Sequence, residues 1–162
     1  MSEQRQRTAS VVALSVVIAL VLAIMPMPEW AGRFRPDWVA LALVYWCMAL
    51  PNRVGVGIGW GTGLLTDVAT GALLGQHALA FTVLAYVTGR LHQRLRVYPL
   101  WQQAASILVL LMLNRLILVW INGIVGHPVE SWTYWAPALT GALLWPWIFV
   151  VLRGLRRRFD VS

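Results

Sequence analysis

Two charged side chains interrupt the long apolar stretches of this chain, and they are the residues best placed to do chemistry. Asp67 is the only acidic residue inside such a stretch, and Arg115 is the only arginine. A charge at bilayer depth costs roughly 2.5–3.5 kcal/mol on insertion scales, so it usually faces a partner, a helix interface or a cavity. We therefore take the surroundings of Asp67 as the first candidate for a functional site.

Glycines recur every fourth residue around this carboxylate. The positions are Gly59, Gly63, Asp67, Gly71 and Gly75. Small residues four apart let another backbone approach a membrane helix closely. Four residues turn an α-helix about 40° beyond one full turn, so Gly63, Asp67 and Gly71 share one face best. This face is predicted to pack against another helix or bind a partner.

The spacing places Asp67 and Arg115 at similar depth, which leaves two alternatives. They form an ion pair, or Arg115 reaches the outer headgroups while Asp67 bonds to a neighbouring hydroxyl or backbone group. Asn122 shares a helical face with Arg115, and Asn114 is displaced by about 100°. We predict that Asp67 is structural and holds the third span against the fifth through Arg115 or Asn122. A proton relay would need a second titratable group at that depth.

Patterns for catalysis are missing from the sequence. A metalloenzyme would need several carboxylates or histidines at ligand spacing, and neither H-E-x-x-H nor D-x-x-D occurs. His77, His92 and His127 fall near span ends, where a solvated histidine is expected. Ser106 lacks the G-x-S-x-G context of a nucleophile, and no P-loop is present. We expect no enzymatic activity, no cofactor and no metal.

The composition is that of a polytopic membrane protein. The chain is 59% hydrophobic with ten tryptophans, and its 12% of charged residues is about half the usual share for a soluble domain. All 13 basic residues are arginines, and the net charge is +7. The arginines lie in short clusters between apolar runs, which favours contact with anionic lipid over nucleic acid. The single cysteine, Cys47, excludes an intramolecular disulfide.

The apolar runs predict an all-α fold with six transmembrane helices in one integral membrane domain, 1–162. The first run lacks a small-x-small cleavage pattern and is predicted to be an uncleaved span. The second and fourth runs are near the lower length limit for a span, so a re-entrant hairpin over 54–89, leaving four spans, stays open. The predicted spans are 9–25, 36–50, 54–75, 77–89, 101–125 and 132–152.

Arginine placement predicts the orientation of these spans. Ten arginines fall on the side of the termini and two, Arg33 and Arg35, on the other. By the positive-inside rule, both termini are expected in the cytoplasm. The cytoplasmic arginines are predicted to contact anionic lipid or a soluble acidic partner. The candidates are Arg90, Arg94, Arg96, Arg156, Arg157 and Arg158.

Several of these segments resemble the MreD family, the rod shape-determining membrane proteins of bacteria, especially its proteobacterial members. The resemblance covers nearly the whole chain, and its more specific parts are the Asp67 segment and the Trp-Pro-Trp run. The segments are Phe34-Arg35-Pro36-Asp37-Trp38, Ala49-Leu50-Pro51 with Arg53, Gly61-x-x-x-Leu65-x-Asp67-x-x-x-Gly71-x-x-x-Gly75, and Leu144-Trp145-Pro146-Trp147-Ile148-Phe149.

The resemblance implies a non-enzymatic scaffold of the elongasome in the inner membrane, which helps control lateral peptidoglycan synthesis and cell shape. It implies binding of MreC, a single-span protein, and action with MreB, RodA and a class B penicillin-binding protein. The implied fold is similar to the six-helix substrate-binding subunits of energy-coupling-factor vitamin transporters. It implies no role for Arg115.

Two hypotheses of different classes follow. The first is a scaffold that docks the membrane helix and juxtamembrane segment of MreC. The second is a small-molecule or lipid-binding subunit with a pocket near Asp67. A vitamin-binding pocket would need several polar groups, and that region offers few beyond Asp67, Arg115 and Asn122. The scaffold is therefore favoured.

Overall fold

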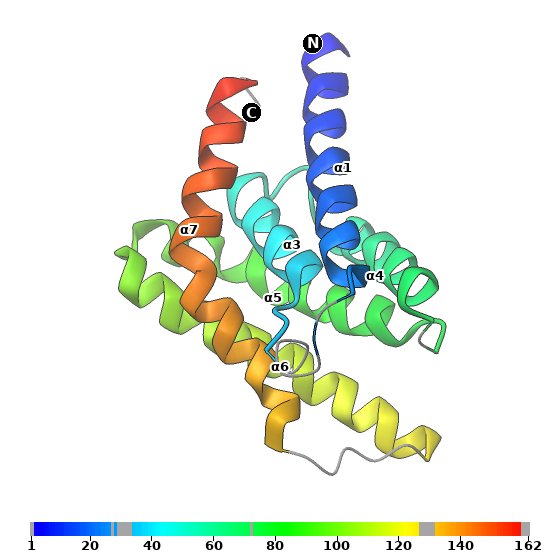
Figure 1. The fold of residues 1–162 in the computed structure, drawn as a ribbon. Helices are drawn as coiled ribbons and strands as arrows, with labels where there is room; N and C mark the ends of the chain where they lie inside the picture. Colours follow the sequence, from blue (N-terminus) through cyan, green and yellow to red (C-terminus); the bar gives the residue numbers. More distant parts are fainter. Residues whose placement is uncertain (1, 27, 29–33, 72, 127–131, 160–162) are drawn as a thin grey trace.

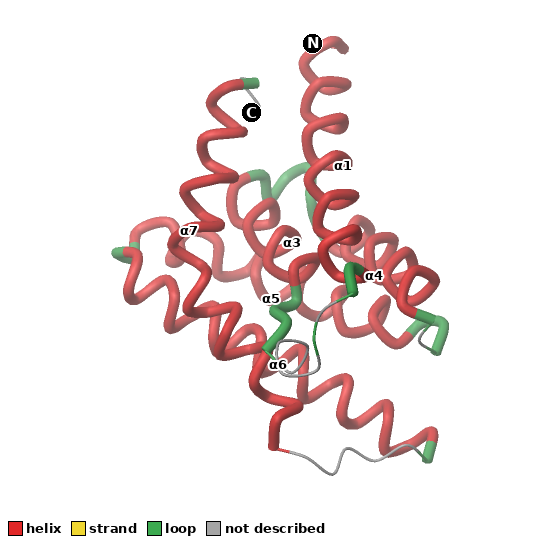
Figure 2. Tube along the Cα trace, in the orientation of Figure 1, coloured by secondary structure: helices red, strands yellow, loops and turns green. Residues whose placement is uncertain are grey.

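A computed structural model describes residues 2–26, 28, 34–71, 73–126 and 132–159. This part of the chain is built of helices joined by short turns (Figure 2). Six α-helices lie at the six predicted spans, so the predicted fold class is confirmed. They are α1 (Ser2–Ile24), α3 (Trp38–Ala49), α4 (Val56–Thr70), α5 (Gln76–Val97), α6 (Leu100–Val125) and α7 (Ala136–Arg158), with a 3₁₀ turn, η1 (Trp132–Trp135), before α7.

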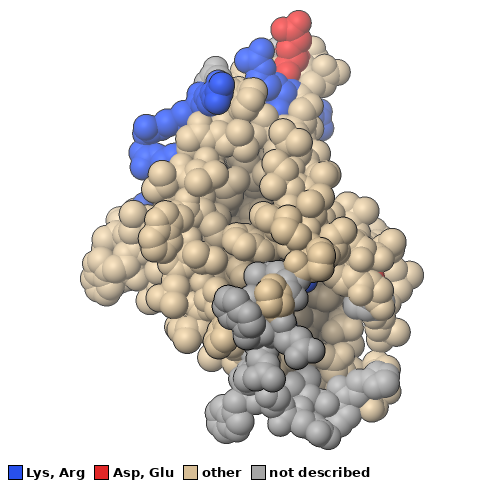
Figure 3. All heavy atoms as spheres, in the orientation of Figure 1, with Lys and Arg blue, Asp and Glu red and all other residues tan. Residues whose placement is uncertain are grey.

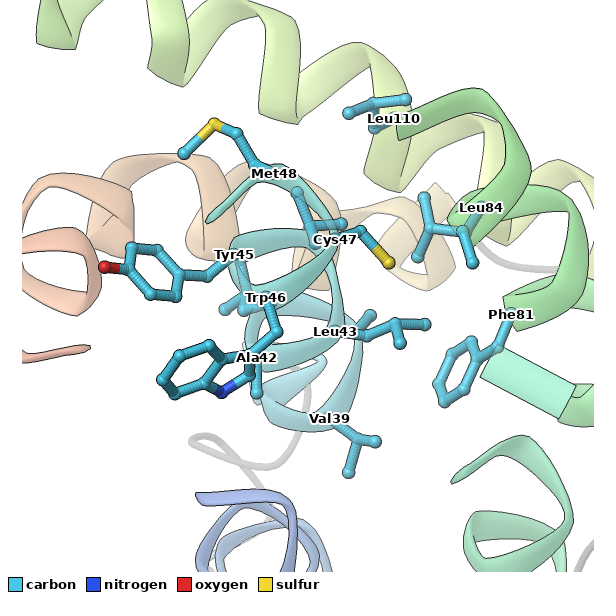
Figure 4. Packing of buried hydrophobic residues seen from close by; sticks show 14 of the residues in the cluster. Val39, Ala42, Leu43, Tyr45, Trp46, Cys47, Met48, Phe81, Leu84 and Leu110 are labelled. Atoms are coloured by element: carbon cyan, nitrogen blue, oxygen red, sulfur yellow. The ribbon is translucent and has the colours of Figure 1, made fainter. Parts of the chain in front are cut away.

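Helix α3 forms the centre of the molecule. Every residue from Val39 to Ala49 is buried, and α3 packs against α1, α4, α5 and α7 (Figure 1). Its side chains radiate to all sides: Tyr45 points toward α7, and Leu43 points toward Phe81 of α5 (Figure 4). At 1.5 Å per residue its 12 residues extend about 18 Å, well short of the roughly 30 Å hydrocarbon layer. It is a core helix surrounded by protein.

The helices around α3 expose apolar side chains on their outer faces. Val109 and Ile124 on α6 and Leu143 on α7 are each more than 60% exposed. Such continuous apolar surface is unfavourable in water and suits the hydrocarbon of a bilayer. Among the described residues, α1, α6 and α7 are long and apolar enough to cross a membrane. The chain is therefore a membrane protein.

Helices α4 and α5 form an antiparallel hairpin whose close packing depends on the absence of a side chain at two glycines. A Cβ at Gly59 would lie 2.7 Å from the Phe81 carbonyl oxygen, and one at Gly63 would lie 2.4 Å from the Ala78 Cα. The predicted close approach is thus present at both positions. Its partner is α5, the next helix along the chain.

The glycine ladder does not continue as one helix, which corrects the predicted span 54–75. Helix α4 ends at Thr70, and Gly71 and Gly75 lie in the turn with φ angles of +70° and +101°. These left-handed conformations favour glycine because it has no Cβ. A Cβ at either position would meet nothing within 4 Å. Gly71 therefore serves the turn and does not share a packing face with Gly63.

Other boundaries differ at their ends. Helix α5 continues past the predicted end at 89 to Val97, and α7 continues through the arginines to Arg158. The predicted turn at His127-Pro128, together with Glu29 and Arg33 of the first loop, lies outside the described residues.

Both ends of the chain lie at the same end of the molecule, on α1 and α7 (Figure 1). On the face shown in Figure 3, arginines gather at this end. Arg96 donates from Nε and Nη2 to the carbonyls of Met48 and Ala49, at 2.9 and 2.7 Å. It satisfies carbonyl groups at the C-terminus of α3 that have no partner within the helix, where a positive charge is favourable.

Candidate functional site: buried charges that join helices

Asp67 lies in the last turn of α4 with its side chain fully buried. Its Oδ1 accepts hydrogen bonds from the backbone N–H of His77 at 2.9 Å and lies 2.8 Å from Nδ1 of the same residue. Its Oδ2 accepts from the backbone N–H of Gly75 at 2.9 Å and, more weakly, of Ala78 at 3.4 Å. These partners belong to the N-cap residue and the first turn of α5.

The Asp67 carboxylate thus acts as the N-terminal cap of α5 from the preceding helix. The first N–H groups of a helix have no partner inside it, and Gly75, at the capping position, has no side chain to supply one. A carboxylate there is further favoured by the helix dipole. Backbone donors and His77 therefore compensate a charge that would be costly alone.

The predicted pair of Asp67 with Arg115 is wrong. Of the alternative, the bonding of Asp67 to backbone groups is confirmed, whereas Arg115 meets Asp37, a partner that the alternative did not include. The expectation of a solvated histidine is also wrong for His77. Its side chain is 19% exposed, and its ring meets Phe81 edge-on with centroids 5.6 Å apart. His77 bonds Asp67 because Gly75 turns the chain back and places the start of α5 against the end of α4.

Asn122 contributes to the same region indirectly. Its Oδ1 accepts a hydrogen bond from Nε2 of Gln76, at 3.2 Å. Gln76 is the residue before His77, so this bond joins the start of α5 to the last turns of α6. The predicted link of Asp67 to the fifth span through Asn122 is therefore wrong: Asp67 joins α4 to the start of α5, and Asn122 of α6 bonds Gln76 instead.

Arg115 pairs with a different carboxylate. Its Nη2 lies 2.5 Å from Oδ1 of Asp37, and its guanidinium stacks on Tyr134 with Cζ 4.9 Å from the ring centre. The ion pair is half-buried, at 13% and 19% side-chain exposure. It joins α6 to the N-terminus of α3 and to η1. Asp37 was not a candidate in the sequence analysis, although it lies at the start of the predicted span 36–50.

The predicted cytoplasmic arginines divide into separate groups. Arg90 stacks on Tyr86, and Arg94 and Arg157 are exposed. Arg158 borders a groove between α1 and α7. Arg96 and Arg156 line a cavity that also contains Arg153, which was not a candidate. Charge clustering along the sequence therefore did not show which arginines converge in space.

A groove between α1 and α7 has a volume of about 750 Å³. Its floor contains the small residues Ser15, Ala19 and Ala42, and its walls are apolar side chains such as Leu22 and Trp147. Figure 3 shows the surface hollowed between these two helices. No pattern in the sequence pointed to it, because each helix contributes only part of the lining.

The described residues hold buried polar contacts that tie helices together. Within this part of the chain, no group of three His, Cys, Asp or Glu residues could hold a metal ion. Sequence analysis missed the buried polar contacts made by four residues: Asp37, Gln76, His77 and Gln103. Each lies at a helix end or turn, where its partner is a backbone group or a residue distant in sequence.

These features define an all-helical membrane protein whose buried charges join its helices. A family model described as "rod shape-determining protein MreD" matches residues 4–155. The chain is also 32% identical over 142 residues to the rod shape-determining protein MreD of Haemophilus influenzae, covering 88% of each chain. It belongs to the MreD family and has a role in determining rod shape. No solved structure matches it, so the similarity to energy-coupling-factor subunits stays a prediction.

Proposed function

We propose that this protein is a non-enzymatic, multi-pass scaffold of the elongasome in the inner membrane, with both termini in the cytoplasm, and that it binds the membrane helix of MreC. Membership of the MreD family supports the role in cell shape. The apolar groove between α1 and α7 is the observation that supports helix binding. MreB, RodA and a class B penicillin-binding protein would act in the same assembly.

The groove has the chemistry expected of a helix-docking surface. Small residues line its floor, which lets a second helix approach closely, as at other helix interfaces in membranes. Its walls are apolar, so they suit a single-span helix that has no polar face. Arg158 stands at the end nearest the termini and would face the juxtamembrane segment of that helix.

Two neighbouring valines on α7 provide the test. Val151 lines the groove, whereas Val150 does not, and their exposures are similar at 67% and 60%. Val151→Trp should reduce co-purification of tagged MreC about tenfold, since overpacking an interface typically costs 1–3 kcal/mol. Val150→Trp is the matched control and should retain MreC. The proposal for this groove fails if both variants retain MreC equally and both restore rod shape.

The alternative, a ligand-binding subunit with its pocket at Asp67, has less support. Both carboxylate oxygens are occupied by the first turn of α5, and the side chain is fully buried. A ligand would have to displace these bonds. Mass spectrometry of the purified protein for a stoichiometric bound small molecule distinguishes the two functions.

A further inference from the structure

A polar cavity of about 320 Å³ lies at the end of the molecule that carries the chain termini. Three arginines from two helices converge on it, together with one phenol, one amide and one phenyl ring. The lining residues are Tyr45, Met48, Ala49, Arg96, Gln103, Phe149, Arg153 and Arg156. No acidic side chain is among the described residues of this lining, so the cavity is strongly positive.

The walls of the cavity are fixed by contacts among the lining residues and with their neighbours. Arg96 is held by its two bonds to the C-terminus of α3, and Arg153 lies over Phe149 with Cζ 5.9 Å from the ring centre. Gln103 is 2% exposed; its amide accepts from Trp145 at 2.9 Å and donates to the Leu95 carbonyl at 2.7 Å. The Arg156 guanidinium lies beside the Tyr45 phenol. The site is therefore organised without a ligand.

Like charges brought together in this way repel each other unless an anion lies between them. Guanidinium groups match the oxygens of phosphate with paired hydrogen bonds, which makes arginine the usual residue for phosphate recognition. The volume is roughly ten times the share of one water molecule, so a phosphate group fits. Val97 follows Arg96 in the chain, and Trp101 lies two residues before Gln103; they are 83% and 74% exposed, so apolar surface suited to lipid lies close in the chain to the lining residues.

We propose that this cavity binds one phosphate group, that of an anionic phospholipid in the cytoplasmic leaflet. Basic pockets between membrane helices on that side are suited to acidic headgroups. The phosphate would join α5 to α7 beside the buried end of α3. This site lies apart from the groove proposed for MreC, so the two proposals can fail independently.

The chain offers matched variants for the test. Arg153→Gln removes one cavity arginine, and Arg157→Gln removes an equal charge from the same helix outside the cavity. A double variant is tested in the same way. Arg96→Gln/Arg153→Gln removes two cavity arginines, and its control, Arg94→Gln/Arg157→Gln, removes two arginines outside the cavity. Because Arg96 also caps α3, the single Arg153→Gln variant keeps the test valid if the double variant does not fold.

The measurement is native mass spectrometry of the purified protein titrated with phosphatidylglycerol, phosphatidylcholine or inorganic phosphate. We expect one phosphatidylglycerol per protein, held more tightly than phosphatidylcholine, with about tenfold weaker binding in Arg153→Gln and wild-type binding in Arg157→Gln. Equal loss in cavity and control variants, or equal binding of the two lipids, overturns the site. Saturation by inorganic phosphate that blocks phosphatidylglycerol overturns the lipid assignment. MreC takes no part in this experiment.

Discussion

At the scale of single residues, the buried charges Asp67 and Arg115 are compensated by groups of another helix or of its first turn. Asp67 meets backbone N–H groups and His77, and Arg115 meets Asp37. Asp67 and Asp37 lie at helix ends, where a terminus leaves polar groups without partners, whereas Arg115 lies within α6. The buried charges therefore help to fix where helices begin and end. Mutation of these residues should lower the free energy of unfolding.

The first prediction separates the two possible partners of Asp67. Asp67→Asn removes the charge and one acceptor, leaving buried N–H groups of α5 unsatisfied, and should lower the free energy of unfolding in detergent by about 1–3 kcal/mol. A double-mutant cycle with His77→Gln should show a coupling of about 0.5–3 kcal/mol, because the side chains are in contact.

The control for that cycle is Asp67→Asn with Arg115→Gln. Arg115 bonds Asp37, so these two losses should be additive within about 0.5 kcal/mol. Coupling to Arg115 combined with additivity for His77 would contradict the described geometry.

Sequence analysis predicted the role of Asp67 but not its partners, and the reason is physical. A single buried carboxylate must be compensated, so its structural role follows from its isolation. Its partners, however, are backbone N–H groups, which every residue except proline carries. Only the positions of the turn glycines decide which of them reach Asp67. The Arg115–Asp37 pair was missed because Asp37 lies at the very start of a predicted span, 78 residues away in the chain.

At the scale of helices, period-four glycines served two different purposes. Gly59 and Gly63 let α4 and α5 touch, whereas Gly71 and Gly75 provide positive φ angles between them. The same spacing is compatible with both, so sequence predicted the packing face but not the end of α4. The six helices themselves were predictable, because a long apolar run predicts a helix from the local sequence alone, independently of the helices that pack against it.

The second prediction compares two glycines of α4 that differ in surroundings. Gly61→Ala should slightly raise stability, since its Cβ meets nothing within 4 Å and alanine favours helix by roughly 0.5–1 kcal/mol. Gly63→Ala should instead lower stability by about 1–3 kcal/mol, because its Cβ would overlap the α5 backbone. Thermal unfolding of both variants in the same detergent gives the signs. Equal stabilisation by both would mean that α4 and α5 do not touch there.

At the scale of the whole molecule, short helices pack inside or beside long ones. Helix α3 is enclosed by its neighbours, and α4, at 15 residues, extends only about 22 Å. Polar contacts fix the ends of the short helices against the long ones. The Asp67 anchor and the Gln76–Asn122 bond fix the turn between α4 and α5 against the C-terminal part of α6. The arginine cavity lies at the opposite end of α5.

The last prediction is the side of the membrane on which the turn between α4 and α5 lies. Helix α6 is apolar and long enough to span, and Asn122 lies about 33 Å along it from Leu100, beyond the roughly 30 Å hydrocarbon layer. Gln76 bonds Asn122, so the turn should lie on the side opposite Leu100. By the positive-inside rule, the arginines at 90–96 predict that Leu100 lies on the cytoplasmic side. A reporter fused after residue 76 should therefore report the periplasm, with a fusion after residue 98 as the cytoplasmic control. A cytoplasmic signal from residue 76 would instead make residues 54–89 a re-entrant hairpin.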